Sequence, residues 1–392
     1  IDLGKLRAGY AKTGNAAAPL TVYNTYGLGT PIAGQGTASL PSSNQNQELK
    51  NEITNEVEIG LEMSMFKNRL GFDLSVYDKT SEDLITPVSI STATGYARQW
   101  LNAGEVQNKG VELSLYGSPV KTDNFEWRID VNWGKNESKV LSLPQGLENL
   151  QLASLQGGVT INAAVGEPYG TIKGTDYIYT DGQVTIDPDN GRYLKTSDRS
   201  QVLGTFQPEW RGGINNRFTW KGLSLSFLID MQKGGSYFSL DRWYGSATGT
   251  YEYTAGLNEN GIPKRDPVSA GGGILLEGVN PDGSVNTTRT RMDYYANALG
   301  YARAPNALHV YDAGFIKLRE LSLGYSLPTK YFADGFVKGL SFTAVGRNLW
   351  IIDKDDKYSD PEAGLSAGNI QGYQSGAYPS TKDFGFSVKL EF

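Results

Sequence analysis

The chain has 392 residues, of which 39 % are hydrophobic and 20 % are charged, and its formal net charge at pH 7 is −6. This acidic balance argues against a nucleic acid as the partner. The absence of cysteine excludes a disulfide framework and a thiolate metal site. A single histidine, His309, leaves too few imidazoles for a histidine-based zinc site or a catalytic triad.

The composition is typical of a β protein with long polar loops, because glycine (48 residues) and tyrosine (23 residues) are both abundant. No apolar run reaches the roughly 18 residues of a membrane-spanning helix, but a barrel strand needs only about 9–11 alternating residues. The sequence starts at Ile1 inside a strand-like pattern and shows no signal peptide. We therefore expect the C-terminal piece of a longer exported protein.

Period-two alternation of apolar and polar side chains predicts ten strands. The expected strands cover residues 3–11, 55–65, 70–79, 105–116, 124–136, 208–218, 222–232, 312–326, 338–349 and 383–392. A soluble sheet alternates in the same way when one of its faces covers a core. The alternation alone therefore does not separate a soluble sheet from a membrane barrel, and the lengths of the connections between the strands have to decide.

The expected strand at 55–65 has the clearest alternation. Leu61 lies among apolar side chains on one face, and Glu56, Glu58 and Glu62 lie on the other face. Unpaired ionised carboxylates are costly to bury in a protein core. Three of them on one face suit the water-filled lumen of a barrel.

The connections between the expected strands alternate between short and long. Short connections lie near residues 66, 118, 220 and 330, and the one near 118 is expected to run through Ser118 and Pro119. Long connections cover residues 12–54, 80–104, 137–207, 233–311 and 350–382, and a hairpin is expected around 187–191. Bacterial barrels have short periplasmic turns and long extracellular loops, which matches this order.

We therefore predict an all-β fold in which residues 1–392 form the C-terminal part of one transmembrane antiparallel β-barrel domain. Because an open sheet edge is not viable in lipid, we expect further strands to precede these ten. Outward aromatic side chains are expected to lie at the membrane interfaces. They are Trp127, Trp133, Trp210, Phe384 and the C-terminal Phe392.

Five sequence motifs, spread along the chain, resemble the C-terminal half of the SusC/RagA family of TonB-dependent outer-membrane importers. They are LRAGYAKTGN at 6–15, the segment 55–84 with its FKNRL and YDKTSEDL stretches, NAGEVQNKGVELSL at 102–115, DAGFIKLRELSLGYSLP at 312–328, and the RNL and DPE elements at 347–349 and 360–362. The closing aromatic strand is similar as well.

This resemblance implies a barrel of about twenty-two strands, with an N-terminal plug and a TonB box, neither of which lies in this chain. It implies import across the outer membrane of Bacteroidota, energised through the TonB complex, and no covalent chemistry. It also implies a SusD-like surface lipoprotein that closes over the extracellular loops. The implied cargo is oligosaccharide or oligopeptide.

Aromatic side chains in the long connections are the candidate ligand-binding residues, because aromatic faces stack on sugar rings and on peptide side chains. The alternative is that they pack loop on loop or against the lid, and we favour it. The candidates are Trp100, Trp243, Tyr244, Tyr251, Tyr253, Tyr294 and Tyr295, with Arg242 as a polar partner.

One motif and one residue invite a chemical interpretation that the sequence does not favour. The run 364–368 fits the G-x-S-x-G expression of serine hydrolases, but that motif needs a strand–elbow–helix context, and here it lies in a predicted loop. The only histidine, His309, precedes this run and lies at the end of a loop. We expect no catalytic residues.

Clustered aspartates in the connection 350–382 leave a structural calcium site open, because calcium prefers carboxylate oxygens. They are Asp353, Asp355, Asp356 and Asp360, and the run 187–191 is similar in kind. The spacing does not match an EF-hand, and Tyr358 occupies the position where that loop has glycine. Solvated turns are the favoured alternative.

Two other classes of function stay open on sequence grounds. One is a passive porin or an adhesin barrel, which the absence of an upstream plug would favour. The other is a secreted glycan-binding β protein that never enters lipid. The sequence does not separate glycan cargo from peptide cargo, because aromatic-rich loops serve both.

Overall fold

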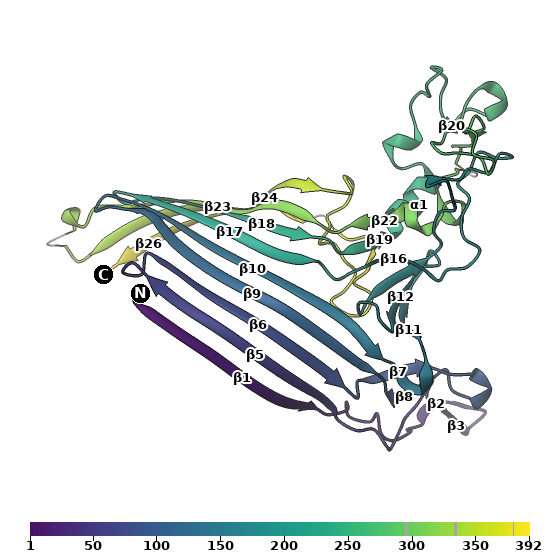
Figure 1. Cartoon of the computed structure of the whole chain (residues 1–392), viewed down its shortest axis with the longest axis horizontal. Helices are drawn as coiled ribbons and strands as arrows, with labels where there is room; N and C mark the ends of the chain where they lie inside the picture. The colour runs from purple at the N-terminus through teal and green to yellow at the C-terminus, as the bar shows by residue number, and fades with distance from the viewer. Residues whose placement is uncertain (295–296, 333–334, 379) are drawn as a thin grey trace. The chain divides into compact units, whose positions relative to one another are not determined.

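The computed structural model describes the whole chain except residues 295–296, 333–334 and 379. Its main sheet has ten antiparallel strands, drawn in Figure 1. They are β1 (Leu3–Asn15), β5 (Glu52–Met65), β6 (Leu70–Glu82), β9 (Glu105–Lys121), β10 (Phe125–Ser142), β17 (Trp210–Trp220), β18 (Leu223–Lys233), β23 (Phe315–Ser326), β24 (Gly339–Lys354) and β26 (Asp383–Glu391). They pair in this same order, so each of the ten predicted strands is confirmed.

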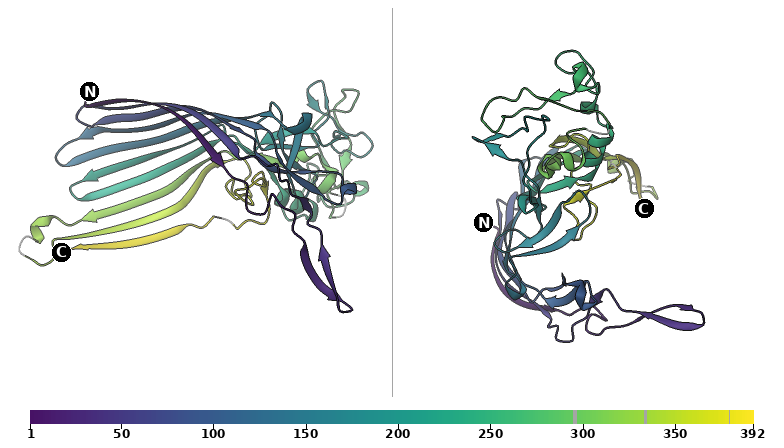
Figure 2. Two further views of the ribbon diagram at one scale, coloured as in Figure 1. Left: turned by 90° about the horizontal axis from the view of Figure 1, so that it is seen from below. Right: turned by 90° about the vertical axis from the view of Figure 1, so that its right-hand side faces the viewer.

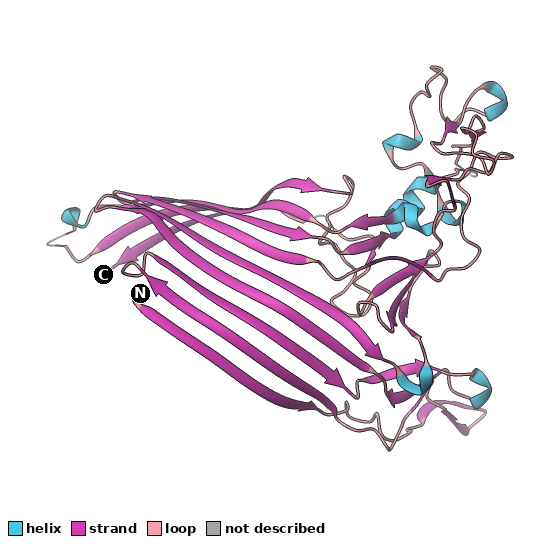
Figure 3. Cartoon of the chain, viewed as in Figure 1, coloured by secondary structure: helices cyan, strands magenta, loops and turns pink. Residues whose placement is uncertain are grey.

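The chain divides into two compact units, which are described separately. The first contains Ile1–Leu150, Ala163–Tyr169 and Gly212–Lys221, and the second contains Gln151–Asn162, Gly170–Arg211 and Gly222–Phe392. Strands dominate both units and helices are few (Figure 3). Within the described residues, none of the helices has the length and apolar character that crossing a membrane would require.

The predicted loops contain secondary structure of their own. The first unit adds β2 (Gly27–Ile32), β3 (Gln35–Ser39), β4 (Ser43–Asn44), β7 (Ile85–Ser89) and β8 (Arg98–Asn102), and Figure 2 shows the β2–β3 hairpin projecting from its unit. The later connections hold β11 (Asn149–Ser154), β12 (Thr160–Ala164), β13 (Thr171–Gly174), β14 (Tyr179–Thr180), β15 (Gln183–Val184), β16 (Gln201–Thr205), β19 (Ser236–Ser239), α1 (Leu240–Thr248), β20 (Ile274–Leu275), β21 (Arg289–Thr290), β22 (Val310–Asp312) and β25 (Tyr373–Gln374). The expected hairpin around 187–191 is also present, because Ile186 pairs with Tyr193 across it.

Seven short 3₁₀ turns complete the secondary structure of the described residues. They are Thr92–Thr94, Pro144–Gly146, Glu252–Thr254, Val268–Ala270, Tyr301–Arg303, Asn306–His309 and Thr329–Tyr331.

One face of the first unit's strands is apolar. Five of these strands run side by side in Figure 1, and their register aligns one large apolar residue from each. The row runs from Leu6 to Leu61, Leu74, Leu113 and Trp133. Cross-strand neighbours on one face contact one another, so the row forms a continuous apolar band.

The opposite face of the same strands is polar and paired. One residue along, the register joins Lys5 to Glu62, Asp73, Ser114 and Asn132. The Arg7 guanidinium donates to both carboxylate oxygens of Asp73, at 3.0 and 2.6 Å. An apolar face opposite a hydrated, charged face is the pattern of a membrane barrel wall.

The second unit repeats this division. Leu223, Tyr325, Phe342 and Val388 are aligned across β18, β23, β24 and β26. The next row along consists of small and hydroxyl residues, which are Ser224, Gly324, Thr343 and Ser387. The alternation that identified the terminal strand therefore extends across its neighbours.

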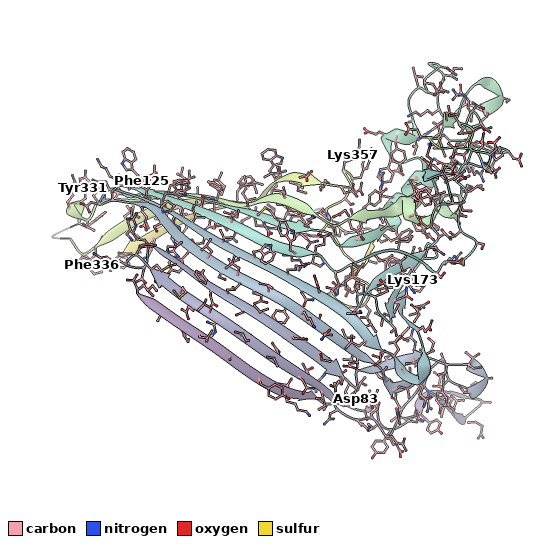
Figure 4. The ribbon with its side chains drawn as sticks, in the orientation of Figure 1. Asp83, Phe125, Lys173, Tyr331, Phe336 and Lys357 are labelled. Atoms are coloured by element: carbon pink, nitrogen blue, oxygen red, sulfur yellow. The ribbon has the colours of Figure 1, made fainter. Side chains whose placement is uncertain are left out.

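Aromatic side chains lie at the short connection between β23 and β24 (Figure 4). Tyr331 and Phe336 are exposed there, and the ring of Phe336 lies 5.1 Å from that of Phe392. Exposed aromatics at the turn end of the strands fit an interfacial girdle.

The predicted link through Ser118 and Pro119 is wrong. Both residues belong to β9, and the chain turns at Thr122, whose hydroxyl accepts a hydrogen bond from the Phe125 N–H. Trp127 pairs with Val120 and Ile129 pairs with Gly117, so Ser118 and Pro119 form a bulge of β9 opposite the single residue Arg128. A bulge tolerates proline, which lacks the N–H that a regular ladder requires.

The long connections of the second unit enclose a small hydrophobic core. Its fully buried members are Val159, Ile161, Ile172, Phe238, Leu240 and Tyr373. The Tyr373 hydroxyl donates to the Val159 carbonyl oxygen, so strands β12, β13, β19 and β25 and helix α1 share one packed centre. These connections are ordered because they bury apolar side chains of their own.

His309 is buried beside this core, with its ring edge-on to Phe238 at 6.3 Å. Burial lowers the pKa of His309 to about 3, because an imidazolium loses its hydration there. A ligand or sensor role at the surface therefore does not match its location.

Arginine in place of Leu61, in the middle of the apolar band, is expected to destabilise the barrel by about 2–4 kcal/mol. The measurement is the free energy of unfolding of the full-length protein in phospholipid vesicles, from a urea titration. Glu58→Gln, on the polar face of the same strand, serves as the control and should leave this free energy nearly unchanged. Equal losses in the two variants would mean that the faces are assigned the wrong way round.

The fold is expected to lose stability as the pH falls from about 6.5 towards 3, because the unfolded chain gains a proton at His309 in this range. The unfolded chain, with a histidine pKa near 6.5, binds a proton in this range that the folded chain does not bind. The free energy of unfolding of His309→Phe, relative to that of the unaltered protein, should then rise by up to about 1.4 kcal/mol for each unit by which the pH falls. Urea unfolding of both proteins between pH 4 and 7.5 measures it, and a pH-independent difference would contradict the burial argument.

Candidate ligand-binding site

A cavity of about 630 Å³ lies in the second unit, where β18 ends, β23 begins and the connection after β24 folds back. The strands contribute Asp230, Gln232 and Phe315 to its lining, and the connection contributes Glu362 and Ser366. Its volume is in the range of small-molecule sites. The long connections 233–311 and 350–382 both start or end here, so the cavity lies at their end of the strands.

Gln232 fixes an arginine at the edge of this cavity. Its amide nitrogen donates to the carbonyl oxygens of Ala313 at 2.9 Å and Gly234 at 3.4 Å, which sets the direction of the amide. Its amide oxygen then accepts a 2.7 Å hydrogen bond from Nε of Arg211. Arg211, an exposed residue of β17, also lines the cavity.

A network of ion pairs borders the same cavity. Lys317, with only 4 % of its side chain exposed, contacts Asp360 at 2.6 Å and Glu362 at 2.5 Å. Arg319 grips both oxygens of Glu362 at 2.9 Å each and contacts Asp230 at 2.5 Å. Buried charges of this kind are tolerated only when they are paired and hydrogen-bonded.

The pKa values of the two loop carboxylates reflect this pairing. Burial alone would raise the pKa of Asp360, but the bonds from Lys317 and Ser380 outweigh burial and hold it below its usual value. For Glu362, the hydrogen bonds from Arg319 and Lys317 likewise overcome burial and lower the pKa. Both groups therefore stay ionised and fasten residues 360–362 to the strand.

The network explains two motifs that are far apart in the sequence. The lysine and the arginine belong to the strand motif at 312–328, and the two acids belong to the DPE element at 360–362. Against β18, Leu318 pairs with Ile229 and Glu320 pairs with Leu228, so Arg319 is the extra residue of a bulge. Bulges commonly redirect a side chain, here towards the acids on both sides of it.

Polar side chains of the first unit line a second hollow, of about 430 Å³. It contains the predicted glutamates Glu56 and Glu58, together with Glu112, Lys79 and Tyr77. The glutamates therefore lie on the polar side of the wall, as the alternation predicted.

Arg242, at the start of α1, lies inside a cage of tyrosine rings. Its guanidinium carbon is 4.5–5.5 Å from the ring centroids of Tyr251, Tyr253, Tyr311 and Tyr358. Nε of Arg242 donates to the Tyr311 hydroxyl at 3.0 Å. Cation–π contacts gain strength in a desolvated setting of this kind.

Charge surrounds the cage as well. Asp356, with 2 % of its side chain exposed, lies 3.8 Å from Arg242. Burial on its own lowers the pKa of Arg242, but the Tyr311 hydrogen bond and the nearby charges raise it above its usual value overall. Burial also raises the pKa of Tyr251 to about 12. Lys357, labelled in Figure 4, pairs with Glu252, and the same carboxylate accepts a 3.0 Å hydrogen bond from the hydroxyl of Tyr358.

Three of the predicted ligand-binding residues are members of this cage. Arg242, Tyr251 and Tyr253 come together, but their faces contact one another and Tyr358. Loop-on-loop packing, the favoured alternative, describes these contacts. Direct contact with cargo stays a prediction for them.

The other predicted aromatics lie elsewhere. Trp243 and Tyr244 pack edge-on to one another and to Tyr301, with centroids 4.8–5.5 Å apart. Trp100, on β8 of the first unit, pairs with Pro87, and Tyr294 is exposed. Tyr295 lies outside the described residues.

The residues of the suspected calcium site take separate partners. Asp355 accepts from the Asp312 N–H, Asp356 caps Tyr358 and Ser359, and Asp360 binds Lys317. Asp187 closes a turn by accepting from Asp189 and Asn190. Among the residues that the structure describes, no three acidic or imidazole groups converge on a point where a metal ion would fit.

The G-x-S-x-G run at 364–368 has no strand–elbow–helix context, and the Ser366 hydroxyl accepts from the Gly368 N–H. Three of its residues, Gly364, Ser366 and Ala367, line the cavity instead. Arg211 and Gln232 are site residues that the sequence did not single out. Arg211 and Gln232 lay inside the expected strands 208–218 and 222–232, and neither belongs to a recognised motif.

The family model described as "TonB dependent receptor-like, beta-barrel" matches residues 2–349. Among curated proteins, TonB-dependent receptor P26 of Formosa agariphila is 29 % identical over 99 % of this chain and 40 % of its own length. TonB-dependent receptor SusC of Bacteroides thetaiotaomicron is 22 % identical over 99 % of this chain and 37 % of its own. The chain thus spans about two fifths of these relatives.

Solved structures agree on the fold. The structure of the RagAB peptide transporter superposes with a TM-score of 0.75 at 23 % identity, covering 99 % of this chain and 41 % of that one. A RagAB peptide importer in the open-open state gives a TM-score of 0.73 at 21 % identity. The chain belongs to the TonB-dependent receptor-like β-barrels of the bacterial outer membrane.

Proposed function

We propose that this chain is the barrel part of an importer that takes up nutrient oligomers actively across the outer membrane. TonB supplies the energy, a SusD-like lipoprotein caps the long connections, and the cargo is oligosaccharide or oligopeptide. The observation that carries the proposal is the cavity of about 630 Å³ at the end of the strands where the long connections lie. A polar, hydrated wall with a ligand-sized cavity at one end suits the capture of a hydrophilic cargo.

The relatives favour energised import over a passive pore. SusC is named a TonB-dependent receptor, and the RagAB structures are titled a peptide transporter and a peptide importer. The packed core inside the connections of the second unit supports the same choice, because preorganised surfaces dock a partner without a large ordering cost. A porin needs neither a capping partner nor a specific cavity.

The cage around Arg242 supports a docking role for the connections themselves. It joins helix α1 and the segments after it to β22 and to residues 356–358. A surface held by several aromatic contacts and a buried ion pair keeps its shape between encounters. We infer that the lid meets this ordered surface and that the cargo lies beneath it.

The uptake of fluorescently labelled oligopeptides and oligosaccharides by cells producing the full-length protein tests the function. Active import predicts accumulation of one class that a protonophore abolishes, while binding at the cell surface persists. Accumulation that is insensitive to the protonophore would support the porin alternative. Surface binding without any entry would support the adhesin alternative.

A further inference from the structure

We propose that the guanidinium of Arg211 binds a carboxylate of the cargo inside the cavity of the second unit. This inference rests on the proposed function, and it narrows the substrate class to oligomers that carry a carboxylate. The carboxylate is either the C-terminus of a peptide or a uronic acid in a glycan. Both present the same planar, two-oxygen acceptor to an arginine fork.

The other charged side chains of the cavity lining already form ion pairs within the protein. Asp230 and Glu362 both face the cavity, and Arg319 holds each of them. Lys317, behind them, holds Glu362 as well. Neither acid therefore presents a free negative charge that would require a cationic ligand.

Three further polar side chains of the lining also have hydrogen-bond partners within the protein. Gln374 donates to Asp241 and accepts from Ser239, and Gln371 donates to the Ala367 carbonyl oxygen at 3.2 Å. The Tyr237 hydroxyl is 2.9 Å from that of Ser359. These contacts make the lining rigid and leave it little freedom to rearrange around a ligand.

Arg211 differs from these residues. Its Nε is bound to Gln232, and within the described part of the chain neither terminal nitrogen takes part in a hydrogen bond or an ion pair. The edge of the guanidinium formed by its two terminal nitrogens is therefore available, and a carboxylate fits that edge bidentately. Since Ala313 and Gly234 fix the Gln232 amide, the fork is held in place before a ligand arrives.

Apolar side chains near the Arg211 guanidinium can contact the parts of the ligand other than its carboxylate. Phe206, Met231, Ala313 and Phe315 all line the cavity. The Phe206 ring is held in place over Gly170, where even a methyl group would lie only 2.1 Å from it. An arginine beside fixed aromatic rings combines a charge anchor with a hydrophobic wall, as ligand sites usually do.

The test measures the binding of matched ligand pairs to the full-length protein in detergent by isothermal titration calorimetry. One pair is a random hexapeptide mixture with free C-terminal carboxylates and the same mixture with C-terminal amides. The other pair is hexagalacturonate and its methyl ester, in which each carboxylate is neutral. The proteins are the unaltered form, Arg211→Gln and Lys233→Gln, which removes an equal charge from an exposed pair with Glu209 at 3.6 Å.

We expect one of the acidic ligands to bind roughly 10- to 100-fold more tightly than its neutral partner, because charged hydrogen bonds contribute at this level. Arg211→Gln should remove that preference without changing the affinity for the neutral ligand, and Lys233→Gln should preserve it. The pair that shows the preference identifies the source of the carboxylate.

Three outcomes would overturn the proposal. Equal affinity for the acidic and neutral ligands would leave the import function standing and disprove the role of Arg211. Equal loss in both variants would indicate a general electrostatic effect. If none of the oligomers binds the unaltered protein and none enters cells, the proposed function fails and the carboxylate site fails with it.

Discussion

Backbone hydrogen bonding in lipid is the constraint on which the rest of this structure depends. A strand that crosses the hydrocarbon must pair its N–H and C=O groups with neighbouring strands, because no water is present to satisfy them. The pairing of neighbouring strands throughout the main sheet meets this requirement. Once the register is fixed, alternate side chains have to face lipid and water, which places Leu61 among apolar neighbours and Glu62 beside Lys5 and Arg7.

Outside the hydrocarbon, water can satisfy the backbone groups, so the fold of the connections depends on other interactions. The connections of the second unit combine a packed apolar core, centred on Phe238 and Tyr373, with buried or half-buried charges. Lys317 and Arg319 hold the DPE element against the strand, and Arg242 holds the cage. The site at the end of the strands is thus built by pairing charges over long distances in the sequence, and not by a local motif.

The strands could be predicted from the sequence because their signal is local: each alternates with a period of two, and Glu56 to Glu62 shows it within a few residues. The turn after β9 could not, because the bulge that admits Pro119 depends on the register of the neighbouring strand. The same holds for the candidate site. Tyr251 and Tyr253 could be named as loop aromatics, but their common partner, Arg242, becomes visible only in three dimensions. Arg211 has no sequence pattern, since Gln232 orients it from another strand.

The segment from Asp356 to Glu362 is attached at both of its ends. Asp356 meets Arg242 in the cage, and Asp360 and Glu362 meet the lysine and arginine of β23. The seven residues from Asp356 to Glu362 therefore connect the cage around helix α1 to the rim of the cavity, so that a displacement of α1 is coupled to the rim through this segment. Because the attachments are mainly ionic and largely shielded from solvent, added salt should weaken this mechanical link far less than it weakens the exposed ion pairs of the molecule.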